Sequence, residues 1–168
     1  STRPDRYLVK AATRVLAAQS LIALPDNLRL SCERLCTAYM AETADTPIEA
    51  LHPTLYFLEG VLAGTNPADV ASETNNPSWV ATAATLARIL TLLRPTGELP
   101  EAADTPVLRS DVIAQALRLG LLLQNKSIIG APTPIQLHCL AYALMNRMHS
   151  NGAIVFRNDT PAPQLNVW

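Results

Sequence analysis

Apolar residues recur along most of this chain at the spacing of three and four residues that gives an α-helix one buried face. In the first such segment the apolar face carries Tyr7, Leu8, Ala11, Val15 and Ile22. The pattern predicts six helices, over residues 4–23, 27–41, 51–63, 78–93, 109–124 and 133–150, and one short strand over residues 153–157. We therefore expect an all-α fold in which consecutive helices pack antiparallel.

Proline and glycine mark the ends of these helices. The 13 prolines fall almost entirely between the predicted helices, where they stop one helix or start the next. Thr133-Pro134 is typical of a helix start, with a capping threonine before proline at the first helical position. Gly97 and Gly152 each follow the end of a predicted helix, and we expect both to adopt a left-handed backbone conformation.

The tripeptide Asp-Thr-Pro occurs three times, starting at Asp45, Asp104 and Asp159. The first two copies are 59 residues apart and the last two are 55 residues apart. Gly97 and Gly152 both stand seven residues before the aspartate that follows them. Such nearly constant spacing indicates a repeated structural unit.

Each of the first two tripeptides precedes a helix that is apolar on nearly every side except for one polar stripe. At the 59-residue offset the stripe positions match in pairs, His52 with Asp111, Tyr56 with Gln115 and Glu59 with Arg118. A helix of this kind is usually internal, and its polar stripe then needs a wet cavity or polar partners. Tyr56 can pair with Gln115, and Glu59 with Arg118, across these two adjacent helices, and we expect Glu59 and Arg118 to form a polar network in the core.

The repeated unit is therefore an inner helix, a loop, an outer helix and a return loop that ends in Asp-Thr-Pro. Such αα-hairpins stack as a solenoid or close into a toroid, so we expect residues 1–168 to form one domain that is part of an (α/α) toroid. Counted from the third tripeptide, Asn166 takes the position of His52 and Asp111. A further inner helix should begin there, and we expect a second polypeptide or a second copy to complete the array.

Composition excludes some classes of function. The formal net charge is −1 and no basic run is present, so nucleic acid is not an expected partner. No stretch is long and apolar enough to cross a membrane, and the N-terminus does not resemble a signal peptide. Charged residues make up 16% of the chain against 49% apolar residues, which hints that something outside the chain covers apolar surface.

The three cysteines are Cys32, Cys36 and Cys139, an odd number that argues against a disulfide framework. Cys32 and Cys36 share one helix face and could form half of a metal site. We favour the reading of packed thiols in a reducing compartment, with a cytoplasmic location, no metal and no cofactor.

The stretches HPTLYFLEG (52–60), TGELPE (96–101), RSDVIAQALRLGLLL (109–123), NGAIVFRND (151–159) and the terminal NVW carry a resemblance. From about residue 45 onward the chain resembles the (α/α)-toroid enzymes that act on carbohydrates, including glucosamine-epimerase-like isomerases and unsaturated glucuronyl hydrolases. In those enzymes the starts of the inner helices and the adjacent loops line the substrate cleft. The resemblance implies that His52, Glu98, Asp111 and Asn166 lie near such a cleft.

The candidate catalytic residues are Asp111, His52 and Glu98, with Glu101 as a further carboxylate. Sugar hydrolysis needs two carboxyl groups across a cleft, and histidine can serve as a general base. Each also has a structural reading: the glutamates as solvated loop residues, Asp111 as a helix-dipole charge and His52 as a histidine bonded to backbone or to the neighbouring repeat. The candidate substrate-binding residues are Tyr56, Gln115, Arg118, Asn166 and Trp168.

Three hypotheses follow. The leading one is a part of an (α/α)-toroid protein that binds or processes a carbohydrate as a hydrolase, lyase or isomerase. The alternative is a non-catalytic helical-repeat module that assembles with another chain or with itself. A cavity for a hydrophobic ligand is the third, and no Asp-rich motif supports it.

Overall fold

A computed structural model describes residues 6–19, 21–45, 48, 50–64, 76–159 and 165–166. Its helices are α1 (Arg6–Ala18), α2 (Asp26–Asp45), α3 (Leu51–Gly64), α4 (Pro77–Leu90), α5 (Ser110–Asn125) and α6 (Pro134–Asn146), and its strands are β1 (Ile154–Val155) and β2 (Leu165–Asn166). The predicted all-α fold and the order of its helices are confirmed. The strand predicted over residues 153–157 shortens to β1, which pairs antiparallel with β2.

Side-chain caps explain where two of the helices begin. The Asn76 side chain accepts hydrogen bonds from the backbone N–H groups of Ser78 and Trp79, with Pro77 in the first turn of α4. Thr133 forms a capping box with Gln136 at the start of α6. Both caps satisfy backbone donors that have no partner inside the helix.

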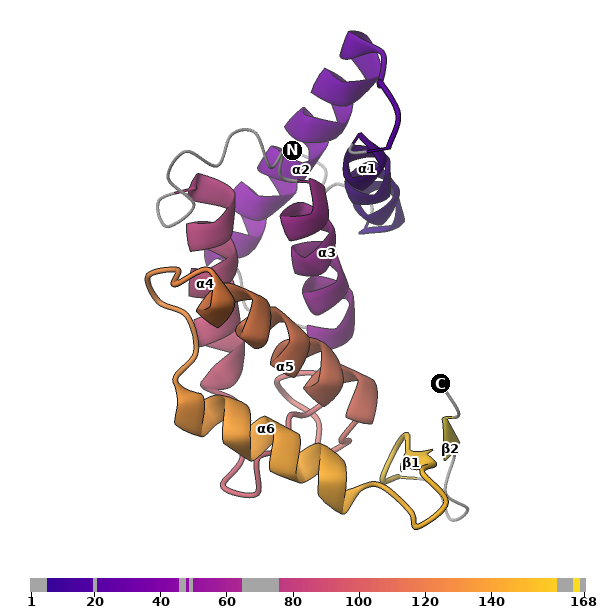
Figure 1. Cartoon of the computed structure of the whole chain (residues 1–168), viewed down its shortest axis with the longest axis vertical. Coiled ribbons are helices and arrows are strands. Elements are labelled where there is room, and N and C mark those ends of the chain that lie inside the picture. Colours follow the sequence, from indigo (N-terminus) through magenta and orange to yellow (C-terminus); the bar gives the residue numbers. More distant parts are fainter. Residues whose placement is uncertain are drawn as a thin grey trace.

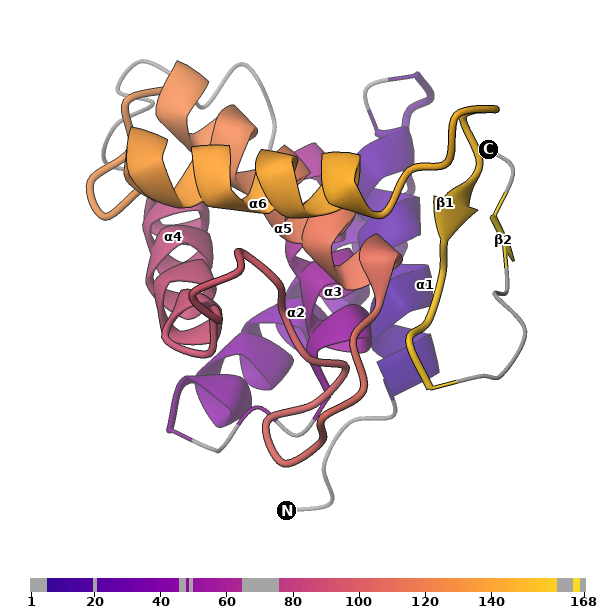
Figure 2. The ribbon, with the colours of Figure 1, turned by 90° about the horizontal axis from the view of Figure 1, so that it is seen from below.

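The odd-numbered helices form an inner row. α1 packs against α3 and α3 packs against α5, while α1 also packs against α2, α3 against α4, and α5 against α4 and α6. Figure 1 shows α3 between α1 and α5, and Figure 2 shows α6 lying across α5. This is the contact pattern of αα-hairpins side by side. Closure of such a row into a toroid stays a prediction.

The core runs along this row and the helices packed on it, and its fully buried leucines include Leu55 and Leu58 of α3, Leu86 of α4, Leu119 of α5 and Leu140 of α6. α1 and α3 approach closely because Gly60 of α3 faces Thr13 of α1, where a β-carbon would lie 2.3 Å from the threonine hydroxyl. The rings of Tyr39 and Phe57 join α2 to α3, edge to face at 4.7 Å. Among the described residues, no helix is long and apolar enough to cross a membrane.

The backbone repeats at the 55-residue offset. Gly97 and Gly152 have φ angles of +81° and +83°, which confirms the expected left-handed conformation. The N–H of Arg94 donates to the carbonyl of Glu98 at 3.0 Å, and the N–H of His149 donates to that of Ala153 at 2.8 Å. The two return loops thus fold in the same way.

Two of the inner helices, α3 and α5, are attached to the return loop that follows them by equivalent hydrogen bonds. The N–H of Leu51 donates to the carbonyl of Glu101, and the N–H of Ser110 donates to that of Phe156, both at 3.0 Å. Leu51 and Ser110 are the first residues of α3 and α5. The return loop therefore lies at the start of the preceding inner helix, where candidate site residues cluster.

The strand register changes the predicted position of Asn166. Leu108 bridges to Pro100, and Leu165 pairs with Val155, the residue equivalent to Pro100. Leu165 therefore matches Leu108, and Asn166 matches Arg109 and not Asp111. Leu108 follows Asp104 by four positions, whereas Leu165 follows Asp159 by six. The position predicted for Asn166 by counting from Asp-Thr-Pro was therefore wrong by two residues. Asn166 lies in β2 and not at a helix start.

Candidate functional site

His52 and Asp111, which the repeat places at equivalent positions, are in direct contact. Nε2 of His52 lies 2.9 Å from Oδ2 of Asp111. The contact arises because α3 and α5 are neighbours in the inner row, so the starts of both helices lie close together. The equivalence predicted from sequence is therefore also a spatial pairing.

Arg109 holds the other side of the carboxylate. Its Nε and Nη2 donate to the two oxygens of Asp111 at 3.0 and 2.6 Å, and its Nη1 donates to Glu101 at 2.8 Å. Such two-point binding fixes the plane of a carboxylate. Glu101 also forms an ion pair with Arg157, whose Nη2 lies 3.2 Å from Oε2 of Glu101. Arg109 is not among the site residues predicted from the sequence.

These contacts keep Asp111 ionised. Burial raises the pKa of its carboxyl, but the hydrogen bonds from His52 and Arg109 and the charges of those groups outweigh burial and lower the pKa to about 2. Because the carboxylate carries no proton, Nε2 of His52 is the nitrogen that carries one. The imidazole has no other polar partner in the described part of the chain, so Nδ1 is available to accept a proton.

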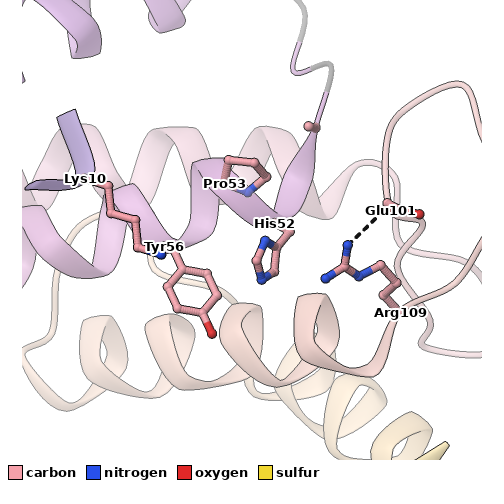
Figure 3. A pocket seen from close by; sticks show the side chains of 7 residues that line it. Lys10, His52, Pro53, Tyr56, Glu101 and Arg109 are labelled. Atoms are coloured by element: carbon pink, nitrogen blue, oxygen red, sulfur yellow. Dashed lines mark hydrogen bonds and ion pairs between the residues drawn. The ribbon is translucent and has the colours of Figure 1, made fainter. Parts of the chain in front are cut away.

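A pocket of about 320 Å³ opens beside this contact (Figure 3). We call it the His52 pocket, and it is lined by Lys10, Ala50, His52, Pro53, Tyr56, Glu101 and Arg109. The rings of His52 and Tyr56 lie 4.6 Å apart, and the Lys10 ammonium lies 5.0 Å from the centre of the Tyr56 ring. The pocket therefore combines an aromatic face, an oriented imidazole, two cations and one carboxylate, that of Glu101, which is paired with Arg109.

A second pocket of about 400 Å³ adjoins the first, since Tyr56 lines both. Asp111, Gln115 and Arg118 are among its lining residues. Glu59 pairs with Arg118 at 2.9 Å and accepts a hydrogen bond from Gln115. The predicted Glu59–Arg118 pair is confirmed, but Arg118 is 67% exposed, so the pair lies at the surface and not in the core.

Tyr56 and Gln115 line the second pocket together, and Gln115 hydrogen-bonds to Glu59. The polar stripes of α3 and α5 thus meet on one face of the inner row.

Glu98 lies apart from this cluster. Its carboxylate pairs with Arg147 at 3.0 Å and lines neither pocket. Nε of Arg147 also donates a hydrogen bond to the Ser110 hydroxyl at 2.7 Å. The expectation that Glu98 joins His52 and Asp111 is not met, because the end of α6 supplies a buried cation closer to it. The side chain of Asn166 and all of Trp168 lie outside the described residues.

The cysteines match the reading as packed thiols. Cys32 and Cys36 are buried and all three cysteines are free. Burial, and then the neighbouring Cys32 and Glu33, raise the pKa of the Cys36 thiol to about 11. Within the described ranges, no three histidine, cysteine or acidic side chains are grouped to hold a metal ion.

The low pKa of Asp111 predicts a loss of stability in acid. An unfolded aspartate titrates near 3.9, so the stabilisation is complete above that pH and disappears as the pH falls towards 2. We expect the wild type to lose about 2 kcal/mol more than Asp111→Asn between pH 5 and pH 2. Urea unfolding followed by circular dichroism measures the difference. Equal losses in the two proteins would contradict the pairing, and Asp104→Asn, at an exposed aspartate, serves as the control.

No protein-family model, curated protein or solved structure matches this chain. Its function has to be argued from the chemistry of the site.

Proposed function

We propose that the chain binds an acidic carbohydrate in the His52 pocket. The observation that carries the proposal is the grouping of Tyr56, Lys10 and His52 in one opening of about 320 Å³, with His52 held from behind by Asp111. A sugar ring presents an apolar face that packs on an aromatic ring, and its hydroxyl groups bond to polar side chains. A carboxylate on the sugar would account for Lys10, since Arg109 is already paired with Asp111 and Glu101.

The cations differ in how far they are already neutralised. Arg109 uses three of its five N–H groups on Asp111 and Glu101, which leaves two donors for a ligand. The Lys10 ammonium has no carboxylate partner in the described part of the chain and contacts the Tyr56 ring. Lys10 is therefore the residue best suited to bind an anionic group.

The geometry favours proton transfer by His52 over hydrolysis by two carboxylates. Hydrolysis requires a protonated carboxyl and a second carboxylate within about 5–9.5 Å across one cleft. Asp111 is ionised with a pKa of about 2, Glu98 is bound to Arg147 outside the pocket, and Glu101, which lines the pocket, is paired with both Arg109 and Arg157. His52, oriented by Asp111, can instead accept a proton at Nδ1. A lyase or isomerase reaction on an acidic sugar suits this arrangement, and it accords with the resemblance to (α/α)-toroid enzymes.

Binding is tested by calorimetric titration with glucuronate and, as the neutral comparison, glucose. We expect saturable binding of glucuronate that is stronger than that of glucose and weakens with added salt. Lys10→Gln and Tyr56→Leu should each weaken it by about tenfold, the size of one charged or stacking contact.

Two matched variants serve as controls. Arg14→Gln removes a cation one turn further along α1, and Tyr142→Leu removes an exposed aromatic ring on α6; neither residue lines the pocket. Both should bind glucuronate as the wild type does. Equal binding of glucose and glucuronate, or equal effects of the pocket variants and the controls, would reject an acidic sugar as the ligand.

The second candidate function is a helical-repeat module that assembles with another chain or another copy. Exposed leucines on α5, Leu121 and Leu122, favour it, because large apolar side chains gathered on one helix face are typical of a contact surface. The two functions are compatible, since these leucines do not line the His52 pocket. Free cysteines support a reducing, cytoplasmic location for either function.

A further inference from the structure

One side of α5 presents apolar side chains to solvent. We call it the α5 face, and it consists of Ala114, Leu117, Arg118, Leu121 and Leu122. These residues line an open groove of about 550 Å³ together with Asn125 and Leu144. Leu121 is 51% exposed and Leu122 is 37% exposed. Arg118, the one charged member, is already paired with Glu59.

The equivalent face of α3, the preceding inner helix of the repeat, is covered by other helices. At the 59-residue offset Ala114, Leu117 and Leu121 match Leu55, Leu58 and Leu62 of α3. Those three leucines are 0%, 0% and 6% exposed. α3 is covered because α5 packs beside it as the next helix of the inner row, and α4 packs behind it. The α5 face is therefore the place where a further inner helix would pack.

The opposite end of the row also presents apolar surface. α1 carries the α1 face, which consists of Leu8, Ala11, Val15 and Ala18 at helical spacing. Leu8 is 61% exposed and Ala11 is exposed, whereas Val15 and Ala18 are half-buried. These residues point away from Val9, Thr13 and Leu16, the buried side of α1. α3 separates the two ends of the row (Figure 1).

We propose that the α1 face of a second copy of this chain packs on the α5 face, head to tail, and continues the inner row from one copy to the next. The contact repeats the packing that joins α1 to α3 and α3 to α5 within one chain. It uses two different surfaces on each copy, so the assembly either closes into a ring or extends as a chain. The proposal does not depend on ligand binding at the His52 pocket.

Light scattering coupled to size-exclusion chromatography tests the proposal over a concentration series. The wild type should form an oligomer, and Leu121→Glu and Leu8→Glu should each be monomeric. Both positions are exposed, at 51% and 61%, so the variants should keep the wild-type circular dichroism spectrum. Ile135→Glu, at a position of α6 that is 76% exposed, is the control and should leave the oligomer intact.

An equimolar mixture of the two monomeric variants identifies the orientation. Leu121→Glu keeps a sound α1 face and Leu8→Glu keeps a sound α5 face, so together they can form one head-to-tail contact. We expect the mixture to run at twice the mass of one chain. A monomeric wild type overturns the proposal, as do a mixture that stays monomeric and an Ile135→Glu variant that dissociates as readily as Leu121→Glu.

Discussion

Replacing Gly97 with alanine is expected to lower the free energy of unfolding by about 3 kcal/mol, whereas Gly152→Ala should lower it by about 1 kcal/mol. Both glycines have a left-handed backbone, with φ of +81° and +83°, so both variants pay the strain of a β-carbon there. Only at Gly97 does the new carbon meet another part of the chain. It would lie 2.2 Å from the carbonyl oxygen of Cys139, while the carbon at Gly152 has no neighbour within 4 Å.

Chemical denaturation of the two variants measures this difference. The obstacle at Gly97 is the backbone of α6, which cannot move aside as a side chain can. We therefore expect the larger loss to appear as a lower denaturation midpoint with an unchanged slope. Equal losses in the two variants would mean that the return loop does not press on α6 as the structure has it.

Arg147→Met is expected to cost about 3 kcal/mol, because it removes one partner from a buried polar network. Arg147 is 9% exposed and pairs with Glu98 at 3.0 Å. Its guanidinium also reaches the Ser110 hydroxyl at 2.7 Å and the Leu108 carbonyl at 3.3 Å. The variant leaves the Glu98 carboxylate, the Ser110 hydroxyl and the Leu108 carbonyl without this donor. The hydrogen bonds that join the start of α5 to the end of α6 through Arg147 are then lost.

The matched control is Arg118→Met. Arg118 also pairs with a glutamate, Glu59, but it is 67% exposed, so we expect a loss below about 1 kcal/mol. Thermal unfolding of both variants gives the comparison. A loss at Arg118 as large as that at Arg147 would show that burial does not decide the strength of these pairs.

Local signals in the sequence predict much of the fold. The apolar spacing predicts all six helices, and the prolines and capping residues predict their starts. Helix ends are less accurate: α6 was expected to reach Ser150 and ends at Asn146. Beyond that end the Val155 N–H donates to the Arg147 carbonyl at 2.9 Å, a contact across eight residues that helical periodicity does not reveal.

The repeat predicts the centre of the candidate site but not its surroundings. Equivalent positions in adjacent repeats bring His52 to Asp111, since neighbouring inner helices start at the same end. Lys10 and Arg109 were not predicted as lining residues. Lys10 lies on α1, before the first Asp-Thr-Pro, and Arg109 lies one residue before α5, outside the polar stripe. Glu98 was included because of its carboxylate, and only the packing of α6 shows that Arg147 binds it.

An acidic carbohydrate bound beside His52 should shift the imidazole resonances of that residue, and an NMR titration with glucuronate detects the shift. The chain has three histidines, so the His52 signal can be assigned from its loss in His52→Gln. We predict a saturable shift of the His52 signal, with those of His138 and His149 unchanged, because neither of these lines the pocket. A His52 signal that stays fixed through the titration, or that moves no further than the other two, would show that glucuronate does not bind beside His52.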